Sequence, residues 1–93
     1  MYIFSAKLIY YIPHASSLKD KRQVSRSIIE RARKRFNVSI AEVDTQDTHQ
    51  TLTLGITTVS GEYAFGQNSI DEIIRFMERN SEAELTTIER INY

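Results

Sequence analysis

The stretch YIFSAKLIYYI, residues 2–12, decides the fold class of this chain. Successive side chains of a β-strand point to opposite faces, so the even-numbered residues from Tyr2 to Ile12 form one apolar face. The odd-numbered residues form a mixed face that includes Lys7. Pro13 is the only proline and cannot donate a ladder hydrogen bond, so it ends the strand. Residues 2–12 therefore predict a strand buried on one face.

A helix is expected directly after this strand, from residue 18 to about Phe36. Ser17 and Asp20 have the spacing of a capping box, in which Ser17 accepts from the backbone N–H of Asp20 and Asp20 reaches back. Asn37 follows as a terminator, because asparagine tolerates a left-handed conformation. Apolar residues at helical spacing form the stripe that faces the core. This stripe consists of Leu18, Val24, Ile28, Ile29, Ala32 and Phe36.

The rest of the chain predicts four more elements, which are strands over residues 38–43, 51–59 and 83–93 and a helix over residues 69–79. The polar residues 44–50 join the first two of these strands in a hairpin with a long loop. The second helix has an alternative start at Tyr63, which Gly66 disfavours because glycine weakens helices.

The element order β-α-β-β-α-β most economically gives the ferredoxin-like sandwich of the α+β class. With right-handed crossovers, that order produces a four-stranded antiparallel sheet with both helices on one face. The 93 residues suffice for one two-layer core, so a single domain is expected over residues 1–93. The chain has no cysteine, which excludes disulfides and cysteine-ligated zinc. No apolar run could span a membrane, and a cytoplasmic location is expected.

The distribution of charge is the strongest indication of function. Twelve basic and twelve acidic residues give a formal net charge of zero. Residues 18–36 nevertheless hold eight of the basic residues and only two acidic ones, so this segment carries +6 and the remainder −6. A field of this kind acts on association with partners rather than on the fold.

Basic residues of the expected helix predict a site for nucleic acid or another anion. At 100° per residue, four of them share one narrow arc beside the apolar stripe, and this ridge matches a run of backbone phosphates. Cations in the first turns oppose the helix dipole, and a broken local rule of this kind marks a functional position. The predicted binding residues are Lys19, Lys21, Arg22, Arg26 and Arg33.

A purely structural interpretation of the same residues stays open. Arg33, Lys34 and Arg35 lie at the carboxyl end of the helix, where cations relieve the dipole without any partner. Lys21 projects into the apolar arc, where its stem can lie along apolar surface while its ammonium reaches water.

The acidic residues around the hairpin loop are expected to hold the hairpin or contact a partner. Glu42, Asp44, Asp47 and His49 are types that bind metals, but a polar hairpin loop is normally solvated. No metal and no cofactor are therefore expected. Glu42 and Asp47 can instead stabilise the hairpin or meet the basic helix of a neighbouring subunit.

An enzyme is the least favoured class. The chain contains no glycine-rich phosphate loop, serine elbow or paired-carboxylate motif. Only His14, His49 and Asp47 remain as plausible catalytic residues. The strand over residues 51–59 also lacks aromatic residues on which bases stack, so any RNA contact falls to the helix.

The open face of the expected sheet predicts a homodimer. It carries Ile3, Ile9, Tyr11 and Val59 among threonines, which is too apolar for a monomer. Tyr11 is assigned to dimer packing and to contact with a partner. Pairing of two sheets is favoured over a pocket for a small-molecule substrate.

Two strings of the sequence resemble the YlxP-like family of small bacterial proteins, also known as domain of unknown function 503. They are SLKDKR (residues 17–22) and FNVSIAEV (residues 36–43), followed by Gln46-Asp47. The matching positions are Ser17, Leu18, Lys19, Lys21, Arg22, Asn37, Ala41, Glu42 and Asp47. Thr48-His49 and the segment 66–68 depart from the family's pattern. The resemblance implies a ferredoxin-like fold and no defined activity, and neighbouring genes for translation factors associate the family with the ribosome.

The sequence thus predicts a non-enzymatic binding module in translation or ribosome biogenesis. Its expected partner is RNA or a ribosomal particle, bound through the basic helix. The alternative is a structural homodimer whose basic helix binds an acidic protein surface.

Overall fold

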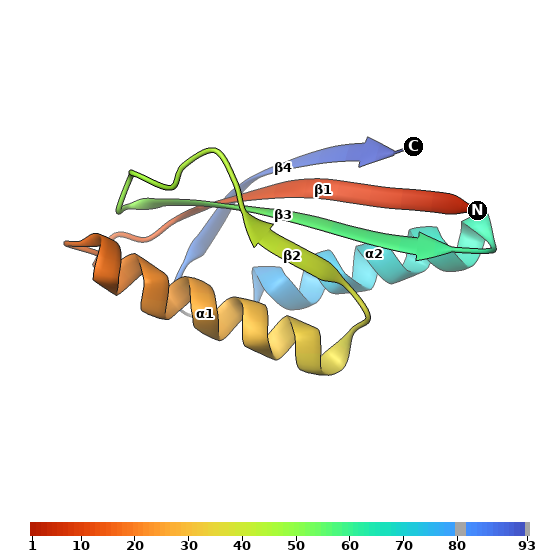
Figure 1. Cartoon of the computed structure of the whole chain (residues 1–93), viewed down its shortest axis with the longest axis horizontal. Coiled ribbons are helices and arrows are strands. Elements are labelled where there is room, and N and C mark those ends of the chain that lie inside the picture. Colours follow the sequence, from red (N-terminus) through yellow and green to blue (C-terminus); the bar gives the residue numbers. More distant parts are fainter. Residues whose placement is uncertain (80–81, 93) are drawn as a thin grey trace.

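A computed structural model describes residues 1–79 and 82–92, and of residue 92 the backbone. These described residues form four strands and two helices in the expected order (Figure 1). They are β1 (Tyr2–Tyr11), α1 (Leu18–Arg35), β2 (Ser39–Glu42), β3 (Thr51–Ser60), α2 (Tyr63–Glu78) and β4 (Glu84–Asn92).

The strands make one antiparallel sheet in the order β2-β3-β1-β4. The long central pair runs in continuous register from Tyr2 opposite Ser60 to Tyr11 opposite Thr51. Both helices cover the same face of this sheet (Figure 1). The prediction of a ferredoxin-like α+β sandwich is therefore confirmed.

The core lies between the sheet and the helices, and the alternation of residues 2–12 builds its centre. The inward-facing β1 residues from Phe4 to Tyr10 are buried, as is Ile12 beyond the strand. Leu54 of β3 lies opposite Leu8 in the register and is also buried. The phenol of Tyr10 donates to the Met77 carbonyl of α2 at 3.0 Å. Burial raises the pKa of Tyr10, since it disfavours the phenolate.

Helix α2 begins at Tyr63, so the expected start at residue 69 is wrong. Gly66 lies in the first turns of the helix and is buried. A Cβ there would overlap the Phe4 ring and lie 2.9 Å from Cβ of Ser60. Glycine at this position therefore permits close approach of α2 to the sheet, and this benefit outweighs its low helix propensity.

The other boundaries differ from the expected ones by at most one residue. Helix α1 ends at Arg35, and Phe36, in an extended conformation, caps it with a backbone N–H bond to Ala32. Asn37 is thus not the terminator. Strand β2 spans Ser39–Glu42, although the N–H of Val43 still bonds to the Thr53 carbonyl at 2.9 Å. The last expected strand residue, Tyr93, lies outside the described residues.

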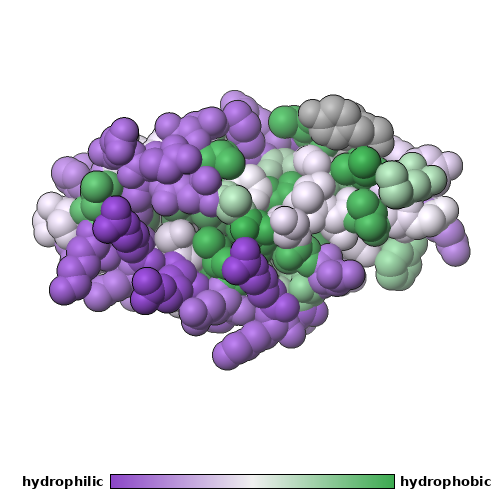
Figure 2. Space-filling model, in the orientation of Figure 1, coloured by the Kyte–Doolittle hydropathy of each residue, from purple (hydrophilic) through white to green (hydrophobic). Residues whose placement is uncertain are grey.

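The molecule is elongated, with principal extents of 43 × 22 × 17 Å. The two helices are displaced along this long axis and overlap only near their carboxyl-terminal halves (Figure 1). Figure 2 shows mostly hydrophilic residues at the end where α1 begins and more apolar residues toward the end where the chain begins. Among the described residues, no helix is long and apolar enough to cross a membrane.

Candidate nucleic-acid interface

The start of α1 is fixed by side-chain caps, as the sequence predicts. The Ser17 hydroxyl accepts the backbone N–H of Asp20 at 3.1 Å. The Asp20 carboxylate reaches back to Ser16, accepting from its backbone N–H at 3.0 Å and its hydroxyl at 2.8 Å. These hydrogen bonds lower the pKa of Asp20, and the bond from the Ser16 backbone N–H has the largest effect. The cap holds the first turn in place despite the cations that follow it.

Lys21 does not lie on the exposed ridge, and the prediction that it contacts phosphates is wrong. Its side chain is only 1% exposed. The ammonium donates to the carbonyls of Thr45 at 2.7 Å and Thr48 at 2.6 Å and lies 2.7 Å from Oε2 of Glu42. Three short contacts match the three protons of an ammonium group. The structural interpretation, in which the Lys21 ammonium reaches water, is wrong as well.

The loop between β2 and β3 folds around this buried ammonium. The carbonyls of Gln46 and Thr51 lie 3.4 Å from it, so four loop carbonyls converge on one charge. Glu42 comes from β2, opposite the inward-facing Leu54, and is 22% exposed. Within the described chain, Lys21 is the only polar partner of the buried Glu42 Oε2. Glu42 therefore acts inside the hairpin.

Three predicted cations, Lys19, Arg22 and Arg26, are exposed on α1. None of them forms an ion pair with any described residue. At 1.5 Å per residue they extend over about 10 Å of the helix, which equals about three phosphate steps of one nucleic-acid strand at about 3.4 Å each along the duplex axis. We call Lys19, Arg22 and Arg26 the α1 patch.

Arg33 lies on the same side of α1 but has a partner inside the protein. Its guanidinium donates to the Ile40 carbonyl of β2 at 2.8 Å. This bond shows that the flank of α1 shared by Arg33 and the α1 patch borders the β2 edge of the sheet. Arg33 itself remains exposed, but holding the edge strand accounts for its position.

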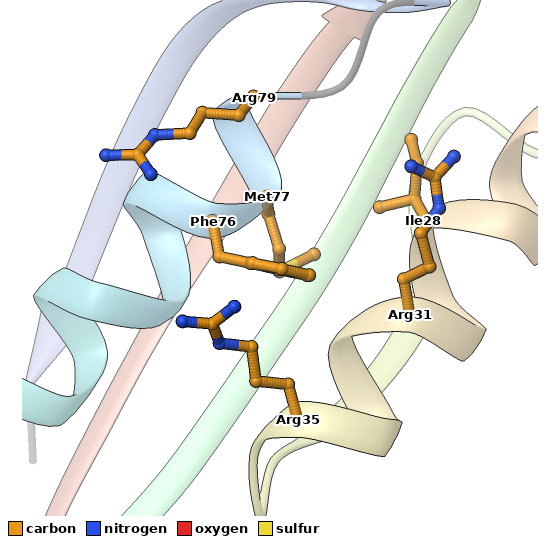
Figure 3. A pocket seen from close by; sticks show the side chains of 6 residues that line it. All are labelled: Ile28, Arg31, Arg35, Phe76, Met77 and Arg79. Carbon is orange, nitrogen blue, oxygen red and sulfur yellow. The ribbon is translucent and has the colours of Figure 1, made fainter.

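Sequence reasoning missed a second cationic group, which lies on the opposite flank of α1. Arg31 and Arg35 of α1 and Arg79 after α2 line a groove between the helices (Figure 3). The Arg35 guanidinium lies 5.1 Å from the ring centroid of Phe76 and 5.7 Å from that of Phe36. The four-residue spacing of Arg31 and Arg35 was the available signal, since it places both on one helix face.

The hairpin loop brings no catalytic or metal-binding group together. Asp47, His49 and His14 are exposed. Asp44 instead pairs with Lys7 on the open face at 2.7 Å, and this bond raises the pKa of Lys7. Nowhere in residues 1–79 and 82–92 do three His, Asp or Glu side chains form a group that could hold a metal ion.

The open face of the sheet is partly apolar, with Val59 62% and Tyr11 43% exposed. At the centre of this face lies a shallow apolar depression, whose lining combines small residues with aliphatic ones. Ser5, Ala41, Val43, Gly55 and Ile91 are among the residues that line it. Tyr11 lies at the end of β1, opposite Thr51 and Glu84 in the two registers.

The fold and the α1 patch define a small ferredoxin-like protein with a basic first helix. The chain belongs to the family described as "Protein of unknown function (DUF503)", whose model matches residues 3–90. It is 38% identical over 72 residues to "Uncharacterized protein YlxP" of Bacillus subtilis (strain 168). The aligned residues make up 77% of this chain and 78% of that protein. The resemblance read from the sequence is thereby confirmed.

A comparison with solved structures supports the fold alone. A de novo designed protein with a ferredoxin fold, solved by solution NMR, superposes with a TM-score of 0.51 at 19% identity. The match covers 99% of this chain and 84% of the designed one.

Proposed function

We propose that this protein is a non-enzymatic, cytoplasmic module that binds RNA, in translation or ribosome biogenesis. The observation that carries the proposal is the α1 patch, three neighbouring cations without an ion-pair partner among the described residues. Each cation that neutralises a phosphate releases counterions and so contributes salt-dependent affinity. A ribosomal particle is the expected carrier of that RNA.

The contrast with Lys21 supports this interpretation of the α1 patch. Cations near a helix amino terminus oppose the dipole, at a cost of a few tenths of a kcal/mol each. For Lys21, this cost is offset by the carbonyl and carboxylate groups that contact its buried ammonium. Lys19 and Arg22 have no such compensation in the described structure, and an external anion would supply it.

The sheet offers little to nucleobases, which leaves the contact to the helix. On the open face of the central pair β1 and β3, Tyr11 is the only aromatic residue. Base recognition on a sheet of this kind usually depends on several stacked aromatic side chains. The proposed contact is therefore with RNA backbone rather than with bases.

Fluorescence anisotropy with a labelled RNA, measured over a series of salt concentrations, tests the proposal. The variant Lys19→Ala/Arg22→Ala/Arg26→Ala should flatten the slope of log K against log salt by about 2, for three lost contacts with a single strand. The control Lys19→Arg/Arg22→Lys/Arg26→Lys keeps every charge and should retain the slope. An unchanged slope in the alanine variant would refute the phosphate role.

The open sheet face favours a second candidate function, that of a structural homodimer. Val59, Tyr11 and the apolar depression would be covered by the same face of a second copy. In this alternative the α1 patch binds an acidic protein surface, and Asp47 of the loop is free to meet a partner. Light scattering should report twice the 10.8 kDa mass of one chain. A bound partner that survives nuclease treatment would favour this alternative over RNA.

A further inference from the structure

The groove between the carboxyl-terminal halves of α1 and α2 has the composition of an anion site. Ile28 and Met77 supply apolar lining, and Phe76 lies between the helices (Figure 3). Arg31 and Arg35 enter from α1, and Arg79 follows the end of α2. Two elements far apart in the sequence thus contribute arginines to the lining of one groove, and Arg31 and Arg79 extend toward its opposite sides (Figure 3).

The groove is strongly positive. Its lining contains three arginines and no carboxylate. The adjoining part adds Arg75 and a single acidic residue, Glu72. None of these four arginines forms an ion pair with a residue in the described part of the chain.

Two of the guanidinium groups are held in place before any ligand arrives. Arg31 donates to the Ser27 hydroxyl from Nε at 3.2 Å and Nη2 at 2.7 Å. The Arg35 guanidinium lies within about 6 Å of the ring centroids of both Phe36 and Phe76, and these two rings meet edge to face at 5.4 Å. Held guanidinium groups lose less entropy on binding, and their planar forks suit phosphate oxygens.

Relief of the helix dipoles accounts for only part of this arrangement. The carboxyl end of each helix carries about half a negative charge. Arg33 and Lys34 already lie in the last turn of α1, outside the groove lining. Dipole relief also gives no reason for the Arg35 guanidinium to lie over the Phe76 ring of the other helix.

A second hollow connects the groove with the α1 patch. It lies on the outer side of α1 and includes Arg26 of the patch and Arg31 of the groove. Lys34 adds a third cation to its lining, and Glu30 is its one carboxylate. Cations therefore continue around α1 from one flank to the other.

We propose that the groove binds phosphate groups of the same RNA strand that contacts the α1 patch. This inference rests on the proposed function and extends it, because it assigns Arg31, Arg35 and Arg79 as additional phosphate contacts. The strand crosses the outer side of α1 and continues past the groove, where Arg31, Arg35 and Arg79 are available to its phosphates one after another.

Side-chain NMR of the arginine Nε–H groups tests this inference in the intact protein. The protein is titrated with a single-stranded oligoribonucleotide and, separately, with inorganic pyrophosphate. Signals of Arg31, Arg35 and Arg79 and the ring protons of Phe76 should shift with RNA, together with those of Arg22 and Arg26.

Four other outcomes separate the two proposals. Shifts confined to Arg22 and Arg26 would overturn the groove site and leave the proposed function standing. Shifts confined to the groove would support the groove and refute the α1 patch. A response to pyrophosphate without one to RNA would assign the groove to a small phosphate compound instead. No response to either probe would overturn both proposals.

Variants of the groove provide an independent readout. Arg31→Ala/Arg79→Ala should reduce the salt slope of RNA binding by about 1.4, for two lost contacts with a single strand. Arg31→Lys/Arg79→Lys keeps the charges and should retain the slope. If the alanine variant does not fold, the NMR titration of the wild-type protein still decides the matter.

Discussion

Lys19 and Lys21 are separated by one residue on α1, yet they have opposite roles in the molecule. The Lys21 ammonium is buried and contacts two loop carbonyls and the Glu42 carboxylate at 2.6–2.7 Å. Lys19 is exposed, and within the described residues it has no ion-pair partner. At 100° per residue the two side chains point about 200° apart on the helix. One cation is enclosed by partners inside the fold, while the other faces solvent.

This comparison shows that a count of charges cannot separate structural cations from binding cations. Burial decides, because a charge without water must find partners inside the protein. The Lys21 site is complete in itself, since two loop carbonyls and the Glu42 carboxylate lie within 2.7 Å of its ammonium. The cations of the α1 patch gain comparable partners only when another molecule supplies them.

The largest expected effect comes from removing the buried ammonium. Lys21→Met should lower the free energy of unfolding by about 3 kcal/mol, because it leaves Glu42 and the loop carbonyls without a partner. Lys19→Met is the matched control and should cost less than about 0.5 kcal/mol. Urea unfolding followed by circular dichroism measures both values. Equal costs for the two variants would remove the distinction between these lysines.

Glu42→Gln should have a smaller effect, of about 1 to 2 kcal/mol, because the ammonium keeps its carbonyl partners. A double-mutant cycle with Lys21→Met then gives the coupling between the two side chains. If Glu42→Gln costs as much as Lys21→Met in urea unfolding, the carbonyls contribute nothing and the pair alone holds the loop.

The cap at the start of α1 predicts an effect that depends on pH. The pKa of Asp20 lies below its ordinary value of 3.8, so its stabilising contribution is present above that value. It is lost as the pH falls through the lower pKa of the folded state. The stability difference between wild type and Asp20→Asn should therefore shrink in acid. A difference that stays constant from neutral pH into acid would show that the charge of Asp20 does not contribute.

The smallest expected change in stability accompanies a loss of function. Lys19→Glu replaces an unfavourable charge in the first turn by a favourable one, so it should stabilise the protein by a few tenths of a kcal/mol. The same variant should weaken RNA binding in the anisotropy assay. Tighter binding to RNA, or a clear loss of stability, would contradict the role assigned to Lys19.

Much of the fold could be predicted because periodic patterns report burial directly. The alternation of residues 2–12 and the apolar stripe of α1 both gave elements that the structure contains. The start of α2 could not be predicted in this way. Gly66 disfavours a helix by propensity, and the contact with Phe4 that favours glycine there depends on tertiary packing.

The candidate site could be predicted less completely. Lys21 falls within the apolar arc of the helix, which indicated only that its stem lies along apolar surface. The loop carbonyls that receive its ammonium become close only in the folded chain. The groove was missed because Arg79 follows α2, and only the packing of the helices brings it near Arg31 and Arg35. Positions within one helix are readable from spacing, whereas sites shared between elements are not.

The central claim is that the exposed cations of α1 attach this protein to RNA, and co-sedimentation with ribosomal particles tests it most directly. Wild type and Lys19→Ala/Arg22→Ala/Arg26→Ala are added to cell lysate and separated on density gradients at low and high salt. Wild type should travel with ribosomal particles at low salt and leave them at high salt, while the variant stays at the top of the gradient. A variant that travels with the particles as wild type does, or a wild type that never enters their fractions, would contradict the claim.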